Sequence, residues 1–201
     1  TDPYHAEYEG YFTNRNFDGD AEAGTAGDLA PEGLVYVSAE DSPNGQPLLI
    51  VANEVSGSTT IFSAQTAFDE EFTSLQPIEI AFSGRYTTGL EDGNAEIVAV
   101  DTTSNIMFVM NSSQERIDRV NIEDITNPVL IDTVSLADQG DGIQSVAVNN
   151  VGLVAIAVGA EVSTDNGLIY FMDTTGAFIE TVEVGALPDM VTFTPDGTKL
   201  L

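Results

Sequence analysis

The chain has 201 residues, of which 42% are apolar, and its 33 acidic residues against 5 basic ones give a formal net charge of −28. The apolar share is large enough for a buried core, so the charge does not make the chain disordered. No run approaches the roughly 18 consecutive apolar residues of a membrane helix, and we expect no membrane segment in these residues. A field this acidic repels phosphates, which argues against nucleic acid as a partner.

Two residue types that carry much protein chemistry are scarce. The absence of cysteine excludes disulfides, zinc–thiolate sites and iron–sulfur clusters. His5 is the only histidine, so neither a Ser-His-Asp triad nor a histidine-rich metal centre is expected in these residues. The acidity itself has two interpretations. It is either the solvated surface of a secreted or salt-adapted protein, or in part a set of calcium ligands, since that ion prefers carboxylate oxygens.

The first thirty residues are rich in acids, glycine and aromatics. Residues 7–12 form a candidate strand, and residues 18–24 are a loop by composition. The acid spacing in this loop is similar to the start of an EF-hand loop, but Leu29 stands where the bidentate glutamate should be, so we reject that motif. A less regular calcium loop is the alternative to a plain surface loop, and its ligands would be Asp18, Asp20, Glu22 and Asp28.

Short apolar segments separated by turns follow. Strands are predicted over residues 33–38, 47–53 and 59–62, and Asn44-Gly45 is a strong hairpin signal. Residues 64–77 break this pattern, because the spacing of Phe68, Phe72 and Leu75 allows a short helix that Pro77 would end. We interpret residues 67–77 as a linker. A new strand is predicted directly after it, over residues 78–82.

From residue 94 onward the strands recur as a repeat. Four strand signals within residues 94–136 are followed by a second set within 143–184 and by the start of a third at 190–194. Val98, Val146 and Val191 align with a period near 45 residues. Periods of roughly 40–50 residues with four strands each indicate propeller blades. The first two strands of each unit are almost wholly apolar and the last two are mixed, as expected for inner strands covered on both sides and outer strands partly in water. The fold prediction is therefore all-β, with four-stranded antiparallel blades of the WD40 or YVTN kind forming a partial propeller.

Several segments along the chain carry a resemblance to a known family; they are 14–16, 27–33, 41–45, 49–62, 84–86, 95–99, 145–148 and 184–197. Together they resemble the choice-of-anchor I domain, with residues 8–62 similar to the C-terminal end of that domain and residues 76–201 to its start. The resemblance implies a propeller-like extracellular domain, often attached to the cell surface and similar to mesenchyme-specific surface glycoproteins linked to biomineralisation. Some members carry an alkaline-phosphatase-like label.

The order of the two similar parts predicts a domain organisation, because an end precedes a start. Residues 1–66 would be the C-terminal blade of one propeller domain and residues 67–77 the linker. Residues 78–201 would then be the first two blades, and the start of a third, of a following domain.

Acidic residues recur where the inner strands begin or end. Glu32, Glu96 and Asp189 each precede an inner strand, and Glu54 follows the end of a second strand that runs back to the same rim. Carboxylates that converge at one rim of a central channel repel each other unless a cation joins them. The sequence thus predicts a calcium site there, with Glu96, Asp189, Glu32 and Glu54 as its ligands. Its alternative is that each acid caps a tight turn.

The functional prediction follows mainly from the resemblance. No base accompanies any candidate nucleophile, so the residues favour a non-catalytic module that binds, adheres or scaffolds at the cell surface or outside the cell, stabilised by calcium. Its partners would be other extracellular or surface proteins or glycans, or further copies of itself. The alternative, which the phosphatase-like label implies, is a calcium-dependent phosphoesterase on a propeller. Asn111-Ser-Ser113 also fits a glycosylation sequon.

Overall fold

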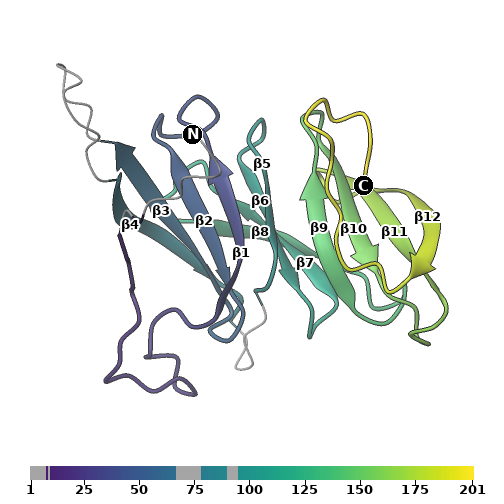
Figure 1. Cartoon of the computed structure of the whole chain (residues 1–201), viewed down its shortest axis with the longest axis horizontal. Helices are drawn as coiled ribbons and strands as arrows, with labels where there is room; N and C mark the ends of the chain where they lie inside the picture. Colours follow the sequence, from purple (N-terminus) through teal and green to yellow (C-terminus); the bar gives the residue numbers. More distant parts are fainter. Residues whose placement is uncertain (1–7, 9, 67–77, 90–94) are drawn as a thin grey trace.

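The computed structural model describes residues 8, 10–66, 78–89 and 95–201, and this part of the chain forms three antiparallel sheets that stand side by side (Figure 1). The first sheet contains β1 (Pro31–Val37), β2 (Leu48–Asn53), β3 (Ser58–Thr66) and β4 (Ile78–Thr87). The second contains β5 (Val98–Asp101), β6 (Ile106–Asn111), β7 (Arg116–Asn121) and β8 (Val129–Ser135). The third contains β9 (Ile143–Val148), β10 (Leu153–Val158), β11 (Asn166–Asp173) and β12 (Phe178–Ala186).

Within each sheet the strands follow chain order, and each pairs antiparallel with the next. The first strands lie toward a common axis, since β5 contacts both β1 and β9. Exposure rises outward: β6 and β10 are buried at every position but the first, whereas β8 and β12 are exposed at nearly every position. This gradient confirms the prediction of four-stranded blades with covered inner strands and wet outer strands.

Aspartates close many of the turns between these strands. Asp173 accepts hydrogen bonds from the backbone N–H of Thr175 at 2.8 Å and of Ala177 at 3.0 Å, and from the Thr175 hydroxyl at 2.6 Å. These bonds lower the pKa of Asp173, and similar threonine and backbone bonds lower the pKa values of Asp124 and Asp196. Turn capping therefore accounts for part of the unusual acid content.

The strand predicted at residues 78–82 belongs to the first sheet, which corrects its assignment to the following unit. It is the start of β4, which pairs with β3 from Ser58↔Thr87 to Thr66↔Ile78. The physical reason is that β1 to β3 alone would leave the outer edge of β3 unpaired. The boundary between the first two sheets thus falls after Thr87. The division of the chain into two tandem domains stays a prediction.

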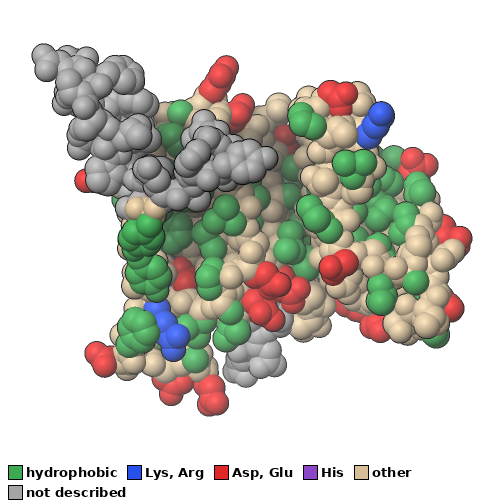
Figure 2. All heavy atoms as spheres, viewed as in Figure 1, with side chains coloured by type: hydrophobic (Ala, Val, Ile, Leu, Met, Phe, Trp, Pro, Cys, Tyr) green, Lys and Arg blue, Asp and Glu red, His purple; other side chains and the backbone are tan. Residues whose placement is uncertain are grey.

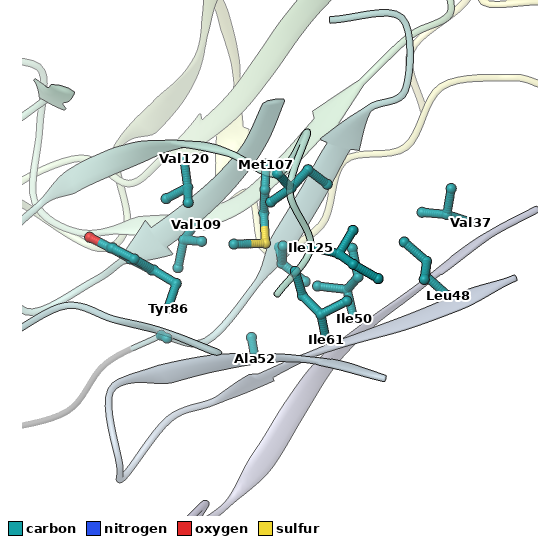
Figure 3. Close-up of a cluster of buried hydrophobic side chains, with 13 residues drawn as sticks. Val37, Leu48, Ile50, Ala52, Ile61, Tyr86, Met107, Val109, Val120 and Ile125 are labelled. Atoms are coloured by element: carbon teal, nitrogen blue, oxygen red, sulfur yellow. The ribbon is translucent and has the colours of Figure 1, made fainter. Parts of the chain in front are cut away.

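The first and second sheets share one apolar core. Leu48, Ile50 and Ile61 of the first sheet face Met107 and Val109 of the second (Figure 3), and all five are fully buried. A second core joins the second and third sheets through Phe108, Met110, Ile117, Val146, Ile156 and Met172. Burying this area is what holds the blades together.

One glycine sets how closely the first two sheets approach. A Cβ atom built on Gly84 of β4 would lie 2.0 Å from the carbonyl oxygen of Ile125, in the segment between β7 and β8. No side chain fits there without moving the backbone.

The last twelve residues begin another blade-like unit. Thr192 and Leu201 exchange backbone hydrogen bonds at 3.1 and 2.9 Å, and Thr194 N–H donates to the Lys199 carbonyl at 2.9 Å, which forms a short hairpin. Val191 and Phe193 pack on the third sheet beside Ala155 and Ile169. The hairpin lies where the sequence predicts a further repeat to start, with one bridge between Phe193 and Leu200, and the further repeat stays a prediction.

Two other sequence predictions fall at the margins of the described chain. The short helix predicted from Phe68, Phe72 and Leu75 lies outside the described residues. In the predicted strand at 7–12, the described residues 8 and 10–12 are not in a strand. Nowhere in the described ranges is there a helix long and apolar enough to cross a membrane.

Candidate functional site: the channel face

The inner strands line a hollow of about 630 Å³. Its walls are formed by β1, β5 and β9, together with residues 190–197, and the side chains that line it are mostly apolar, among them Leu34, Val35, Ile97 and Val148. Figure 2 shows acidic side chains gathered near the lower ends of β1 and β5, at the edge of this face. Gly33 and Ile97, which line the hollow, are next in sequence to Glu32 and Glu96, and we call this acidic edge beside the apolar walls the mouth.

Three glutamates meet at this mouth: Glu32 on β1, Glu54 directly after β2, and Glu96 shortly before β5. Glu96 is half-buried and accepts a hydrogen bond from the Ser112 hydroxyl. Burial raises the pKa of Glu96; the Ser112 bond opposes that shift, and the negative charges of Glu32 and Glu54 add to it. The mouth is therefore a place where a bound cation would relieve repulsion.

The mouth is tight because β1 and β5 touch through their backbones. A Cβ atom on Gly33 would lie 2.5 Å from the Glu96 carbonyl oxygen and 3.0 Å from the Ile97 Cα. Only glycine allows this approach, which brings Glu32 on β1 close to Glu96 in the segment just before β5.

The other predicted ligands lie elsewhere. Asp189 is exposed between β12 and the C-terminal hairpin. Asp18 and Asp20 are exposed in the loop before β1, where Asp20 accepts the backbone N–H groups of Glu22 at 2.9 Å and Ala23 at 3.2 Å. Across the described ranges, no three His, Asp or Glu side chains are grouped as a metal would require. Of the seven predicted ligands, Glu32 and Glu54 lie near enough to Glu96 for their charges to act on it, but the three do not form such a group, and calcium binding stays a prediction.

Asp28 is buried, with its side chain 6% exposed, and ties the N-terminal residues to the first sheet. Its carboxylate pairs with Arg85 at 2.5 Å and accepts hydrogen bonds from the hydroxyls of Ser58 at 2.8 Å and Thr60 at 2.5 Å, and from the Asn14 amide. These four donors occupy the oxygens that the calcium-loop alternative assigned to a metal. Asp28 thus holds the segment before β1 against β3 and β4.

A second buried carboxylate lies between the first two sheets. Asp118 on β7 is fully buried, accepts a hydrogen bond from the Tyr86 hydroxyl at 2.9 Å, and lies 2.9 Å from Arg116 Nε. Burial first, and then the Asp118 charge and hydrogen bond, raise the pKa of Tyr86. The blades are therefore joined by a polar contact as well as by the apolar core.

The glycosylation sequon is not available in the folded chain. Asn111 is fully buried, and its Oδ1 accepts hydrogen bonds from Gln114 N–H at 3.1 Å and from the Ser113 hydroxyl at 3.3 Å. A glycan on Asn111 would need to displace the end of β6, so the sequon reading is wrong for the folded state.

The sequence reasoning found the glutamates of the mouth and missed the contacts of Asp28 and Asp118. The sequence indicated that these glutamates lie near one another because an acid recurs just before successive inner strands. The partners of Asp28 are up to 57 positions away, at Arg85, and no local pattern indicates such a pair. The close approach of Gly33 likewise shows no sequence signal beyond the glycine itself.

Three consecutive four-stranded antiparallel sheets with their first strands along one axis define a β-propeller, here present in part. The chain belongs to the choice-of-anchor I domain family, whose model matches residues 96–201, more than half of its length. This confirms the predicted family for the second and third sheets. The match does not include residues 8–62, whose similarity to the end of the same domain stays a prediction. No curated protein sequence matches the chain significantly.

Solved propellers share the fold at low sequence identity. Hydrazine synthase from Kuenenia stuttgartiensis has a TM-score of 0.61 and 18% identity over 95% of this chain and 44% of its own. A chain of a nidogen/laminin complex has a TM-score of 0.55 and 16% identity over 88% of this chain and 57% of its own. A 6-phosphogluconolactonase-like protein from Bacteroides fragilis has a TM-score of 0.58 and 12% identity over 85% of this chain and 46% of its own. The chain therefore spans about half the length of these propellers, and at such identities they show the fold alone.

Proposed function

We propose that the chain is a non-catalytic binding or scaffolding module of an extracellular or cell-surface protein, and that it acts through the acidic mouth of its channel face. The observation that carries this proposal is the convergence of Glu32, Glu54 and Glu96 beside an apolar hollow of about 630 Å³. Apolar walls with a few charged groups at one end are typical of binding sites. One similar propeller belongs to a complex of nidogen with laminin, which supports protein binding by this kind of scaffold.

Calcium at the mouth is the second part of the proposal. Glu32, Glu54 and Glu96 would supply carboxylate oxygens, which this ion prefers, and neutralising them would remove the repulsion around Glu96. Because these carboxylates are not a preformed cluster, we expect affinity in the weak range of extracellular calcium sites, with Kd on the order of 1 mM. At ten times that concentration, mass action adds about 1.4 kcal/mol, or a rise in Tm of about 3–6 °C.

Thermal unfolding with and without about 10 mM calcium tests this proposal. The wild-type chain should show the rise, whereas Glu96→Gln and Glu54→Gln should lose most of it. Glu161→Gln, at an exposed position in the loop between β10 and β11, is the matched control and should keep the rise. Equal ionic strength of sodium chloride separates calcium binding from general screening of the −28 charge.

The same site also predicts how the stability of the calcium-free protein depends on pH. The raised pKa of Glu96 means that its charged form is disfavoured in the fold, so it contributes stability below about pH 4.5 that is lost as the pH rises. Without calcium, Glu96→Gln should therefore melt at a higher temperature than wild type at pH 7, and the difference should vanish near pH 4.

If calcium does not raise the Tm of the wild-type chain, the metal proposal is wrong. Calcium-dependent turnover of a generic phosphomonoester would overturn the non-catalytic assignment and favour the phosphoesterase alternative.

A further inference from the structure

The sequence contains two Asn-Gly dipeptides, and the structure places them in different settings. Asn44-Gly45 lies in the turn between β1 and β2, where both residues are exposed, whereas Asn166-Gly167 begins β11, where Gly167 is buried. Asparagine before glycine is chemically labile, because the glycine nitrogen can attack the side-chain carbonyl carbon of the asparagine and close a five-membered ring. Such an intramolecular step depends on the local geometry, and the two sites differ in that geometry.

The turn that contains Asn44 leaves its backbone open. The Gly45 N–H donates to the Ser42 carbonyl at 3.2 Å, with Pro43 at the second position of the turn. Gly45 has a φ of 72°, and a Cβ atom built on it would meet no atom of the described chain within 4 Å. Packing therefore does not oppose rotation of this backbone, and water has access to it.

The side-chain oxygen of Asn44 accepts two hydrogen bonds in this turn. Its Oδ1 accepts from the Ser42 hydroxyl at 2.7 Å and from the Gln46 backbone N–H at 3.1 Å. Because a backbone N–H only donates, the Gln46 bond fixes which atom of the amide is the oxygen. When a nucleophile adds to the carbonyl carbon, negative charge develops on this oxygen, and donors already placed there lower the barrier. These bonds lie within residues 42–46, so the activation of Asn44 does not depend on a neighbouring blade.

The second dipeptide is held in the third sheet. A Cβ atom built on Gly167 would lie 2.6 Å from both the Val158 carbonyl oxygen and the Pro188 Cδ. The Gly167 backbone therefore cannot rotate toward the Asn166 side chain without displacing these atoms. The Asn166 amide is also held through its nitrogen, which donates to Glu183 at 3.0 Å. The sheet thus protects Asn166 from the attack that the turn allows at Asn44.

We propose that Asn44 is a site of spontaneous modification, with water as the co-reactant. The Gly45 nitrogen loses its proton to a base in solution and bonds to the Asn44 Cγ. The Cγ–Nδ2 bond then breaks, and Nδ2 takes up a proton from water and leaves as ammonia. Water opens the resulting succinimide at Cγ to give aspartate, or at the backbone carbonyl carbon to give isoaspartate, in which the main chain passes through Cβ and Cγ. No atom is oxidised or reduced.

Either product changes the connection between β1 and β2. Both add a negative charge to a chain whose net charge is −28, close in sequence to the exposed Glu40 and Asp41. Isoaspartate also lengthens the main chain by one carbon, so the turn bond from Gly45 to Ser42 cannot keep its geometry. The reaction therefore loosens the turn next to the last pair of the two inner strands, Val37↔Leu48.

Peptide mapping of the full chain during incubation in warm, mildly alkaline buffer tests the proposal. Cleavage after glutamate separates the two dipeptides, into peptides 41–54 and 162–180. In the folded chain, peptide 41–54 should gain the mass difference between NH2 and OH and divide into aspartate and isoaspartate forms. Its rate should exceed that of peptide 162–180 by at least about tenfold. In urea, where the sheet no longer protects Asn166, the two rates should come within about threefold of each other.

Two variants separate activation by the turn from the lability of the dipeptide itself. Ser42→Ala removes one donor to the Asn44 Oδ1 and should slow the reaction in the folded chain about fivefold, the effect of a hydrogen bond worth about 1 kcal/mol. Ser38→Ala removes a hydroxyl of the same turn that bonds Asp41 at 2.7 Å, and this matched control should react within about twofold of wild type.

The Tm values of both variants check that they fold, and in urea all three chains should react at the same rate. Equal rates for Asn44 and Asn166 in the folded wild-type chain overturn the proposal. So does a folded Ser42→Ala chain that reacts at Asn44 as fast as wild type.

Discussion

The two faces of the first sheet come from the same strands and differ in what lies against them. Toward the second sheet, Leu48 and Ile50 are fully buried; on the opposite face, Leu34 and Tyr36 are more than half exposed. Side chains on a strand alternate between the two faces of the sheet, and the inner strands of this sheet carry apolar side chains on both faces. What makes one face a core is the neighbouring blade and not the composition of the strand itself.

The buried carboxylates extend this comparison. Asp118 is on β7 opposite Val109, and Thr60 has the equivalent place on β3 opposite Val51. Between the sheets, the strand itself supplies the carboxylate, and Tyr86 of the neighbouring blade bonds it. On the opposite, open face, the strand supplies the Thr60 hydroxyl, and residues 10–30, which we call the N-terminal strap, supply the carboxylate of Asp28. Both faces thus have a carboxylate at the equivalent position, and in the described part of the chain a neighbouring blade covers the face toward the second sheet.

The largest predicted effect compares one substitution on the two faces. Leu48→Ala removes a fully buried side chain between two sheets and should lower the free energy of unfolding by about 2–5 kcal/mol. Leu34→Ala, at 63% exposure on the open face, should change it by about 0.5 kcal/mol or less. Urea unfolding of dilute protein measures both. Equal losses in the two variants would contradict the distinction between a covered and an open face.

The next effect concerns the strap alone. Asp28→Asn removes the charge that Arg85 pairs with in a nearly buried site, and should weaken attachment of the strap by about 1–3 kcal/mol. Arg15 is the only basic residue in the strap, so the rate of trypsin cleavage after it reports strap opening. That rate should rise about tenfold or more in Asp28→Asn.

Asp20→Asn is the matched control, because Asp20 bonds the backbone of its own exposed loop. It should leave cleavage at Arg15 within about twofold of wild type. If both variants are cut at the same rate as wild type, Asp28 does not hold the strap.

The smallest effect lies at alkaline pH and sharpens the description of the covered face. Tyr86 has a raised pKa in the fold, so its stabilising contribution is fully present below about pH 10, where tyrosine ionises in the unfolded chain, and is lost as the pH rises further. Urea unfolding from pH 8 to pH 11 should show this loss in wild type and less of it in Tyr86→Phe. Tyr36→Phe on the open face is the matched control. If the free energy of unfolding falls as steeply with rising pH in Tyr86→Phe as in wild type, Tyr86 is not held neutral between the blades.

The sequence was informative where the physics is local or periodic. Unbroken apolar runs such as Ile106–Asn111 predicted the inner strands, and the repeated acid before them predicted that Glu32 and Glu96 would meet. The sequence was not informative about pairing between strands that are separated by an intervening segment of the chain. Ile78–Thr87 reads as a strand, but nothing in it indicates that β3 is its partner. Asp28 reads as a surface acid, because its burial depends on Arg85 and Thr60, which only folding brings near.

The contact at Gly84 implies that the angle between the first two blades depends on the absence of a side chain at this position. With the Ile125 carbonyl 2.0 Å from where a Cβ would be, even one methyl group would act as a wedge between β4 and the second sheet. Opening that contact would tilt the first blade away from the second at its outer strands and loosen the packing of Ile61 against Val120 and Ile125. The tightness of the core between the two blades therefore depends on a glycine in an outer strand.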